Sequence, residues 1–166
     1  NSFILPMDMN EPETFEIKTK AVIQRFGQID FLFHNAGISQ RGLVKDTSID
    51  IDKKVMNVNF MGVVALTKSV LPFFLQRKSG HFVVTSLVGW FGTPMRSAYS
   101  ASKHALHGFF ESLRAEVWKE NIQVTIVCPG YIQTNISVNA VREDGKSYGK
   151  MDVNQANGMK TSVCAK

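Results

Sequence analysis

The sequence contains few of the residues that build disulfide frameworks, metal centres or membrane spans. Only two of its 166 residues are cysteine, Cys128 and Cys164, and their spacing fits neither a metal-ligand set nor a disulfide framework. Both are therefore expected to be free thiols, and no metal site is expected. The sequence shows no signal peptide and no run of about 18 apolar residues, so no segment is expected to cross a bilayer.

Positive charge is modest and is spread along the chain. There are 19 lysine and arginine residues and 14 aspartate and glutamate residues, which gives a net charge of +5. The basic residues fall on or at the ends of predicted helices and are separated by acids, a pattern typical of solvated helix faces. A nucleic-acid site requires basic residues clustered on one face with interleaved aromatic residues. We therefore expect no nucleic-acid partner.

Apolar runs typical of strands alternate along the chain with amphipathic segments typical of helices. Strands are predicted at 29–34, 81–86 and 122–128, and helices at 12–26, just after 46–48, at 53–77 and from about 99 to 119. This alternation indicates a parallel sheet covered by helices. From 131 to 150 the pattern dissolves into polar, glycine-containing sequence, which predicts a long functional or mobile loop.

Three residues of the second half of the chain can form a proton-transfer site. Tyr99 and Lys103 are four positions apart, so on a helix the ammonium can lie beside the phenol and favour its ionised form. Ser86 ends the strand-like run 81–86, and the carboxyl ends of parallel strands are where ligand crevices form. A Tyr-x-x-x-Lys pair by itself is common on exposed helices, so the prediction depends on the motifs around it.

Two of those motifs follow the ends of predicted strands, and a third lies close to the start of the predicted long helix. They are His34-Asn35-Ala36-Gly37, the segment Asn57-Val58-Asn59-Phe60 before a helical stretch, and Pro129-Gly130-Tyr131-Ile132-Gln133-Thr134. With Ser86 and the Tyr-Lys pair they resemble the short-chain dehydrogenase/reductase family, in which N-N-A-G, an Asn, Ser, Y-x-x-x-K and P-G-x-x-x-T occur in this order. The resemblance covers essentially the whole chain. Residues 5–9, 136–141 and 144–145 are most similar to the dehydrogenase/reductase member 7 group with its 7B branch.

The resemblance implies an α/β fold with a doubly wound parallel sheet of the Rossmann type. Members begin with a strand and a glycine-rich turn that cradles the cofactor pyrophosphate, and this sequence has no G-x-x-x-G-x-G. Phe3-Ile4-Leu5 fits the family's third strand instead, and 158–166 looks like the start of a later helix. We therefore expect 1–166 to be one partial dinucleotide-binding and catalytic domain. It would be truncated at both ends, lack its first two strands and C-terminal part, and be inactive alone.

By the same resemblance, the chain carries the catalytic residues of an oxidoreductase that interconverts a carbonyl and an alcohol. Tyr99 is the expected general acid, and Ser86 would donate a hydrogen bond to the carbonyl oxygen. Lys103 would lower the Tyr99 pKa and bind the nicotinamide ribose, while Asn59 would hold a water that links Lys103 to solvent. A strand-end cap at Ser86 and an ordinary buried polar residue at Asn59 are the structural alternatives.

The expected cofactor is NAD or NADP, with NADP favoured by the resemblance. The matching positions are Asp8 for the adenine amino group, Asn35, Ala36 and Gly37 beside the adenosine ribose, Tyr99 and Lys103 at the nicotinamide ribose, and Ile132 and Thr134 at the carboxamide. His34 departs from the family, which usually has Asn there, and is interpreted as a tolerated structural variant.

The expected substrate is a hydrophobic carbonyl or alcohol such as a steroid, retinoid or lipid ketone. This rests on the apolar residues Trp90, Phe91, Met95 and Tyr131 below the loop 131–150, which could alternatively pack a subunit interface. A catalytically silent binding or scaffold protein with the same fold is the competing function.

Two further expectations concern partners and location. The family resemblance implies a homodimer built on the two long helices, with Phe73, Phe110 and Trp118 as candidate contacts. Resemblance to the member 7 group implies attachment to the endoplasmic reticulum membrane through an anchor before residue 1.

Overall fold

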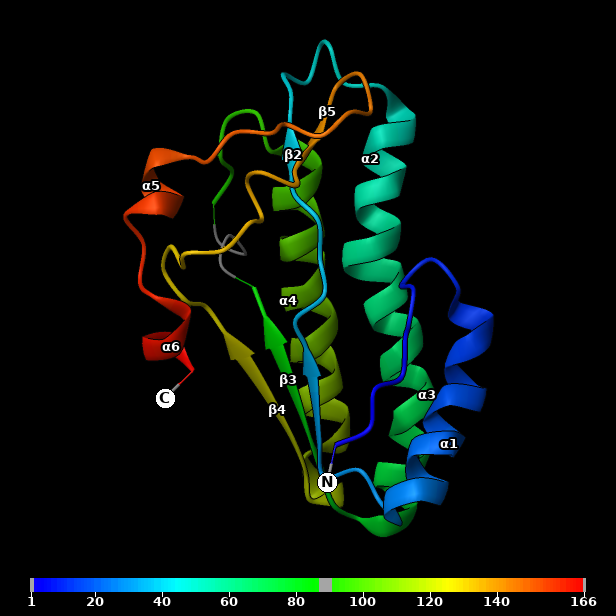
Figure 1. Cartoon of the computed structure of the whole chain (residues 1–166). Helices are drawn as coiled ribbons and strands as arrows, with labels where there is room; N and C mark the ends of the chain where they lie inside the picture. The colour runs from blue at the N-terminus through cyan, green and yellow to red at the C-terminus, as the bar shows by residue number, and fades with distance from the viewer. Residues whose placement is uncertain (1, 87–90, 166) are drawn as a thin grey trace.

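A three-stranded parallel sheet is the centre of the structure, a computed structural model that describes residues 2–86 and 91–165 (Figure 1). The strands are β1 (Phe31–His34), β3 (Gly80–Thr85) and β4 (Ile122–Val127), in the order β1-β3-β4. Phe33 pairs with Val83, which pairs with Thr125, so the carboxyl ends of the strands lie at one edge. The three strand predictions are confirmed to within three residues at each end.

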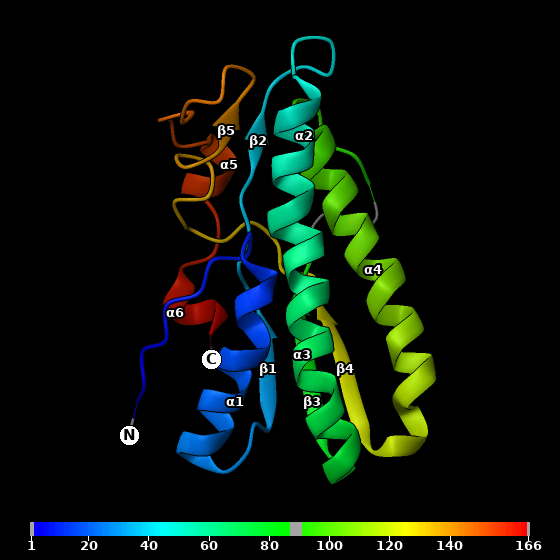
Figure 2. The same ribbon diagram turned by 90° about the vertical axis from the view of Figure 1, so that its right-hand side faces the viewer.

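Helices cover one face of this sheet. The two that pack on it are α3 (Gly62–Arg77) and α4 (Ser97–Val117). α1 (Phe15–Phe26) packs against α3, and α2 (Ile49–Met56) packs against α4. The short α5 (Val153–Ala156) and α6 (Thr161–Cys164) follow near the C-terminus. Figure 2 shows α3 and α4 running alongside the strands. The core contains Val63, Val70 and Phe74 of α3, Leu106, Phe110, Leu113 and Val117 of α4, and Phe82, Val84, Ile122 and Val124 of the strands. The predicted α/β architecture is confirmed.

The two helices predicted between 46 and 77 form one continuous helix, Ile49–Arg77. A π-helical turn, Asn57–Met61, joins α2 to α3. The helix contains an 18-residue window with a mean hydropathy of 1.6, long and apolar enough to cross a membrane, which the sequence analysis did not expect. Core helices of globular domains pass the same test, and the buried side chains of α3 pack into the core described above.

A second, two-stranded sheet lies in the region that was expected to be a loop. β2 (Gln40–Arg41) pairs in parallel with β5 (Val141–Arg142). The segment 131–150 therefore folds back onto the chain that follows β1. The prediction missed both strands because two residues are too few to show a two-residue periodicity.

Two other expectations are wrong. Residues 2–7 contain no strand, and Ile4 is 88% exposed, because within the described chain no neighbouring strand supplies hydrogen-bond partners. Phe110 is fully buried in the core of its own chain, since it lies on the α4 face that packs against the sheet. It cannot contact a partner subunit. Trp118 is 68% exposed and stays available for such a contact.

His34, at the end of β1, is a buried member of this core. Its Nε2 lies 2.9 Å from the Thr67 hydroxyl oxygen, and its ring stacks on Phe82 at a centroid distance of 6.4 Å. Burial lowers the pKa of His34 from 6.5 to about 4, so the imidazole is neutral at pH 7. This environment agrees with a structural role for the histidine.

The buried histidine predicts acid sensitivity. Because its folded pKa is depressed, the stability that His34 contributes is present above pH 6.5 and is lost as the pH falls towards 4. The loss amounts to roughly 3 kcal/mol of unfolding free energy, at about 1.4 kcal/mol per pH unit of pKa difference. Urea unfolding at several pH values should show that the unfolding free energy falls less at low pH for His34→Asn than for the parent. Parallel pH dependences would contradict the assignment.

Candidate active site

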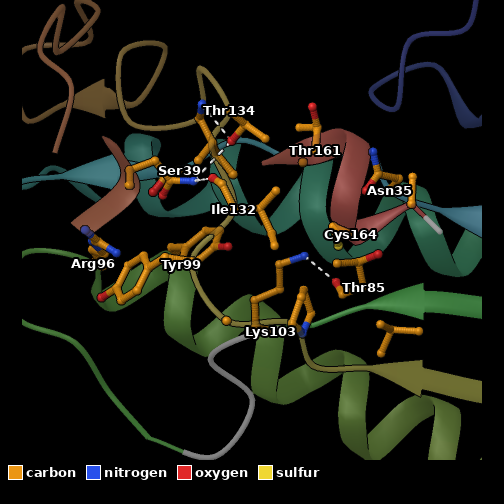
Figure 3. A pocket seen from close by; sticks show the side chains of 18 residues that line it. Asn35, Ser39, Thr85, Arg96, Tyr99, Lys103, Ile132, Thr134, Thr161 and Cys164 are labelled. Carbon is orange, nitrogen blue, oxygen red and sulfur yellow. Dashed lines mark hydrogen bonds between the residues drawn. The ribbon is translucent and has the colours of Figure 1, made fainter. Parts of the chain in front are cut away.

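A cavity of about 390 Å³ opens beyond the carboxyl ends of the parallel strands (Figure 3). Its walls come from the loop after β1, the end of β3, the first turns of α4, the segment after β4, and α5 and α6. The residues that matter most below are Asn35, Gly37, Ser39, Thr85, Arg96, Tyr99, Lys103, Tyr131, Ile132 and Thr134. In a parallel sheet this is the edge at which ligands bind.

Tyr99 and Lys103 lie together in the wall of the cavity. Both are buried and come from the first two turns of α4. The Lys103 ammonium donates a hydrogen bond to the Thr85 carbonyl oxygen at 2.8 Å and lies 5.8 Å from the centre of the Tyr99 ring. Burial lowers the pKa of Lys103 to about 8, which leaves the amine mostly charged at pH 7. The helical spacing therefore places the two groups side by side, as predicted.

The acidity of Tyr99 differs from expectation. Burial raises the pKa of the Tyr99 phenol, and the nearby charges of Arg96 and Arg41 oppose this effect. The pKa of Tyr99 is therefore raised rather than lowered, because removal of the phenol from water outweighs the attraction of the surrounding cations.

Asn59 stands behind the cavity, in the π-helical turn, and is fully buried. Its side-chain oxygen accepts a hydrogen bond from the Ile38 amide at 2.8 Å, and its side-chain nitrogen donates to the Ile38 carbonyl at 2.9 Å and to the Ser102 hydroxyl at 3.0 Å. A Cβ added at Gly37 would lie 3.3 Å from the Asn59 oxygen and 4.0 Å from the Lys103 nitrogen. Asn59 thus joins the loop after β1 to α4.

Ser86 does not line the cavity in this structure. It is fully buried, its hydroxyl donates to the Lys103 carbonyl oxygen at 3.1 Å, and its amide donates to the Val127 carbonyl at 2.9 Å. Trp90, one of the predicted substrate contacts, lies outside the described residues. Phe91 and Met95 are exposed and are not part of the cavity wall, whereas Tyr131 is.

The predicted cofactor residues separate into two sets. Asn35, Gly37, Ile132 and Thr134 line the cavity with Tyr99 and Lys103, while Ala36 does not. Asp8 is exposed and also lies outside the wall of this cavity. It accepts hydrogen bonds from the Asn10 amide and side chain, which lower the Asp8 pKa. The structure therefore brings Asn35 and Gly37, which were expected beside the adenosine ribose, into one cavity with the residues expected around the nicotinamide, and it does not bring Asp8 to them.

The sequence analysis missed a charged cluster next to Tyr99. Asp152, just before α5, pairs with Arg96 at 2.7 Å and with Arg41 of β2. Arg96 precedes Tyr99 by three positions and lines the cavity. The three-residue spacing from Tyr99 could have pointed to Arg96. No local signal points to the Arg41–Asp152 pair, because its residues are 111 positions apart.

Comparison with known proteins agrees with the fold. The family model for short chain dehydrogenase matches residues 1–145, and the chain belongs to this family. It is similar to dehydrogenase/reductase SDR family member 7B of Mus musculus, with 49% identity over 164 residues, 98% of this chain and 51% of that protein. The chain thus spans about half the length of this relative. The predicted likeness to the member 7 group is confirmed.

Solved structures of other dehydrogenases are similar to this chain in fold and sequence. NAD⁺-bound xylitol dehydrogenase is 30% identical with a TM-score of 0.73, over 76% of this chain and 50% of that one. A gluconate 5-dehydrogenase from Burkholderia cenocepacia in complex with NADP and tartrate is 26% identical with a TM-score of 0.76, over 79% of this chain and 52% of that one.

The Asn59 contacts predict a specific loss of stability. Asn59→Ala leaves the Ile38 amide and carbonyl without their partner, and an unsatisfied buried polar group costs about 1–3 kcal/mol. Urea unfolding should show a decrease of that size. Asn57→Ala, which changes an exposed residue of the same π-helical turn, is the matched control and should have a much smaller effect. Equal losses in the two variants would contradict the bridging role.

Proposed function

We propose that the protein to which this chain belongs is an NAD(P)-dependent oxidoreductase that interconverts a carbonyl and an alcohol. The observation that carries the proposal is the burial of Tyr99 and Lys103 together in the wall of one cavity at the carboxyl edge of the sheet. Membership of the short-chain dehydrogenase family supports it, as do related structures that hold NAD⁺ or NADP.

The cavity residues fit the nicotinamide half of such a cofactor. The Lys103 ammonium keeps donors in addition to the one used on Thr85. Within the described chain the Asn35 side chain has no hydrogen-bond partner, and Asn35 faces the same cavity. We assign Lys103 to the ribose hydroxyls, Ile132 and Thr134 to the carboxamide, and Asn35, Ala36, Gly37 and Asp8 to the adenosine half. NADP is the preferred form, by resemblance to the family.

The bound cofactor supplies the hydride for reduction or takes it up in oxidation. The chain itself handles the proton. During reduction the Tyr99 hydroxyl gives its proton to the substrate oxygen, and during oxidation the phenolate takes it back. Because burial raises the pKa of Tyr99, the phenol holds its proton at neutral pH, which is the state required for reduction.

Two other residues assist Tyr99 in this proposal. The Ser86 hydroxyl turns from the Lys103 carbonyl towards the cavity and donates to the substrate oxygen, where charge develops. Asn59 fixes the loop after β1 and orders a water that connects Lys103 to solvent. The Lys103 ammonium returns a proton to Tyr99 after each reductive turnover.

The walls of the cavity favour a hydrophobic substrate. Its apolar residues are Val127, Pro129, Tyr131, Ile132 and Ile136. A ketone or alcohol on a steroid, retinoid or lipid skeleton suits such a surface. In this assignment the main apolar contact with the substrate comes from the segment after β4, and no longer from Phe91 and Met95.

The proposal includes a homodimer at the endoplasmic reticulum membrane. Two exposed apolar side chains, Met61 (54%) in the long helix Ile49–Arg77 and Trp118 (68%) directly after α4, support a subunit interface there. The location rests on the likeness to the member 7 group.

The central test is Tyr99→Phe in the complete protein. The change keeps the ring but deletes the proton donor, so turnover of a hydrophobic ketone should fall by roughly two to four orders of magnitude while cofactor affinity stays the same. Tyr148→Phe, the same chemical change outside the cavity wall, is the control and should keep its turnover. Lys103→Met should weaken both turnover and cofactor binding.

Near-normal turnover of Tyr99→Phe on a ketone that the parent reduces would reject this mechanism. The competing interpretation, a catalytically silent scaffold with the same fold, would then be favoured.

A further inference from the structure

One carboxylate serves two guanidinium groups beside the cavity. The Asp152 side chain accepts hydrogen bonds from Arg96, at 2.7 Å, and from Arg41. The side chains of Arg41, Arg96 and Asp152 are only 5%, 15% and 19% exposed. The cluster therefore carries one more positive than negative charge, and it is sheltered from solvent screening.

The cluster joins three segments of the chain around Tyr99. Arg41 comes from β2, Arg96 immediately precedes α4, and Asp152 immediately precedes α5. Figure 3 shows Arg96 and Tyr99 on the same side of the cavity. Arg41 is further fixed by hydrogen bonds to the Ser39 hydroxyl at 2.7 Å and to the Gln40 carbonyl at 2.6 Å.

Lys103 adds a further charge near the Tyr99 ring. From α4 itself the Lys103 ammonium lies 5.8 Å from the ring centre. The cluster of apolar neighbours around Tyr99 consists of Val55 of α2, Ala98 of α4, Ile38 of the loop after β1, and Ile136 of the segment after β4. The charges of Arg96 and Arg41 both oppose the effect of burial on the phenol.

We propose that Arg96 is a positioning residue that acts on Tyr99 through its charge, with Asp152 as the counter-charge that sets how strongly Arg96 and Arg41 act. This inference rests on the proposed function, because it concerns the residue that moves the proton. The inference gives Arg96 a part in setting the acidity of the Tyr99 phenol. The sequence analysis had given this role to Lys103 alone.

A charge effect and a purely structural ion pair predict different results. If the cluster only holds α5 against α4, removing either partner breaks the same contact and both variants change Tyr99 in the same direction. If the charge acts on the phenol, loss of Arg96 and loss of the Asp152 charge have opposite effects.

The experiment is a pH titration of tyrosine labelled with ¹³C at Cζ, followed by NMR in the absence of cofactor and substrate. The chain has three tyrosines, and Tyr131→Phe and Tyr148→Phe assign the signals. We expect Arg96→Gln to decrease the proton dissociation constant of Tyr99 by roughly 3- to 10-fold, and Asp152→Asn to increase it by a similar factor. Arg96→Lys should stay close to the parent.

Asp144→Asn is the matched control. It removes a carboxylate near Arg142, away from the cavity wall, and should leave the Tyr99 titration unchanged. Far-UV circular dichroism at each pH identifies any variant that unfolds. If Asp152→Asn unfolds, the Tyr99 titrations of Arg96→Gln and Arg96→Lys are compared instead. Only Arg96→Gln removes the charge, so only this variant should shift the titration.

Shifts of Arg96→Gln and Asp152→Asn in the same direction, or no shift in either, would overturn the inference. In the complete protein, the pH profile of kcat/KM should move to higher pH for Arg96→Gln and to lower pH for Asp152→Asn. If Tyr99→Phe abolishes turnover but the titrations do not move, only this inference fails. If Tyr99→Phe keeps its turnover, the proposed function fails whatever the titrations show.

Discussion

The cavity depends on the buried side chain of Asn59. Its three hydrogen bonds reach the Ile38 backbone on one side and the Ser102 hydroxyl on the other, and Ser102 is next to Lys103. A regular α-helix would place residue 59 differently, because a π-helical turn inserts one residue into the helical repeat. The irregular turn therefore aligns the loop after β1 with α4, and the close approach at Gly37 follows from it.

Burial shifts the pKa values of Tyr99 and Lys103, which lie in the cavity wall, in opposite directions. It lowers the pKa of Lys103 to about 8 and raises that of Tyr99, and both changes disfavour the charged form. The phenol is consequently neutral at pH 7, and the lysine can gain or lose a proton close to physiological pH. A neutral phenol beside an ammonium of lowered pKa suits the proposed transfer of a proton to a carbonyl oxygen.

The sequence predicted the parts of the fold that have strong local patterns. Apolar runs located β1, β3 and β4, and the four-residue spacing placed Tyr99 and Lys103 on one face of α4. The two-residue strands β2 and β5 carry no periodic signal, and the Arg41–Asp152 pair joins residues 111 positions apart. The side-chain direction of Ser86 depends on a carbonyl of α4, which no motif reveals. The features that could not be predicted from the sequence therefore all depend on tertiary contacts.

The most direct measurement is a crystal structure of the complete protein with oxidised NADP bound. Our account predicts the nicotinamide ring in the cavity between Tyr99 and Ile132, with the ribose hydroxyls within hydrogen-bond distance of the Lys103 nitrogen. A bound cofactor that leaves these residues untouched, or a cavity that excludes it at saturating concentration, would contradict the account.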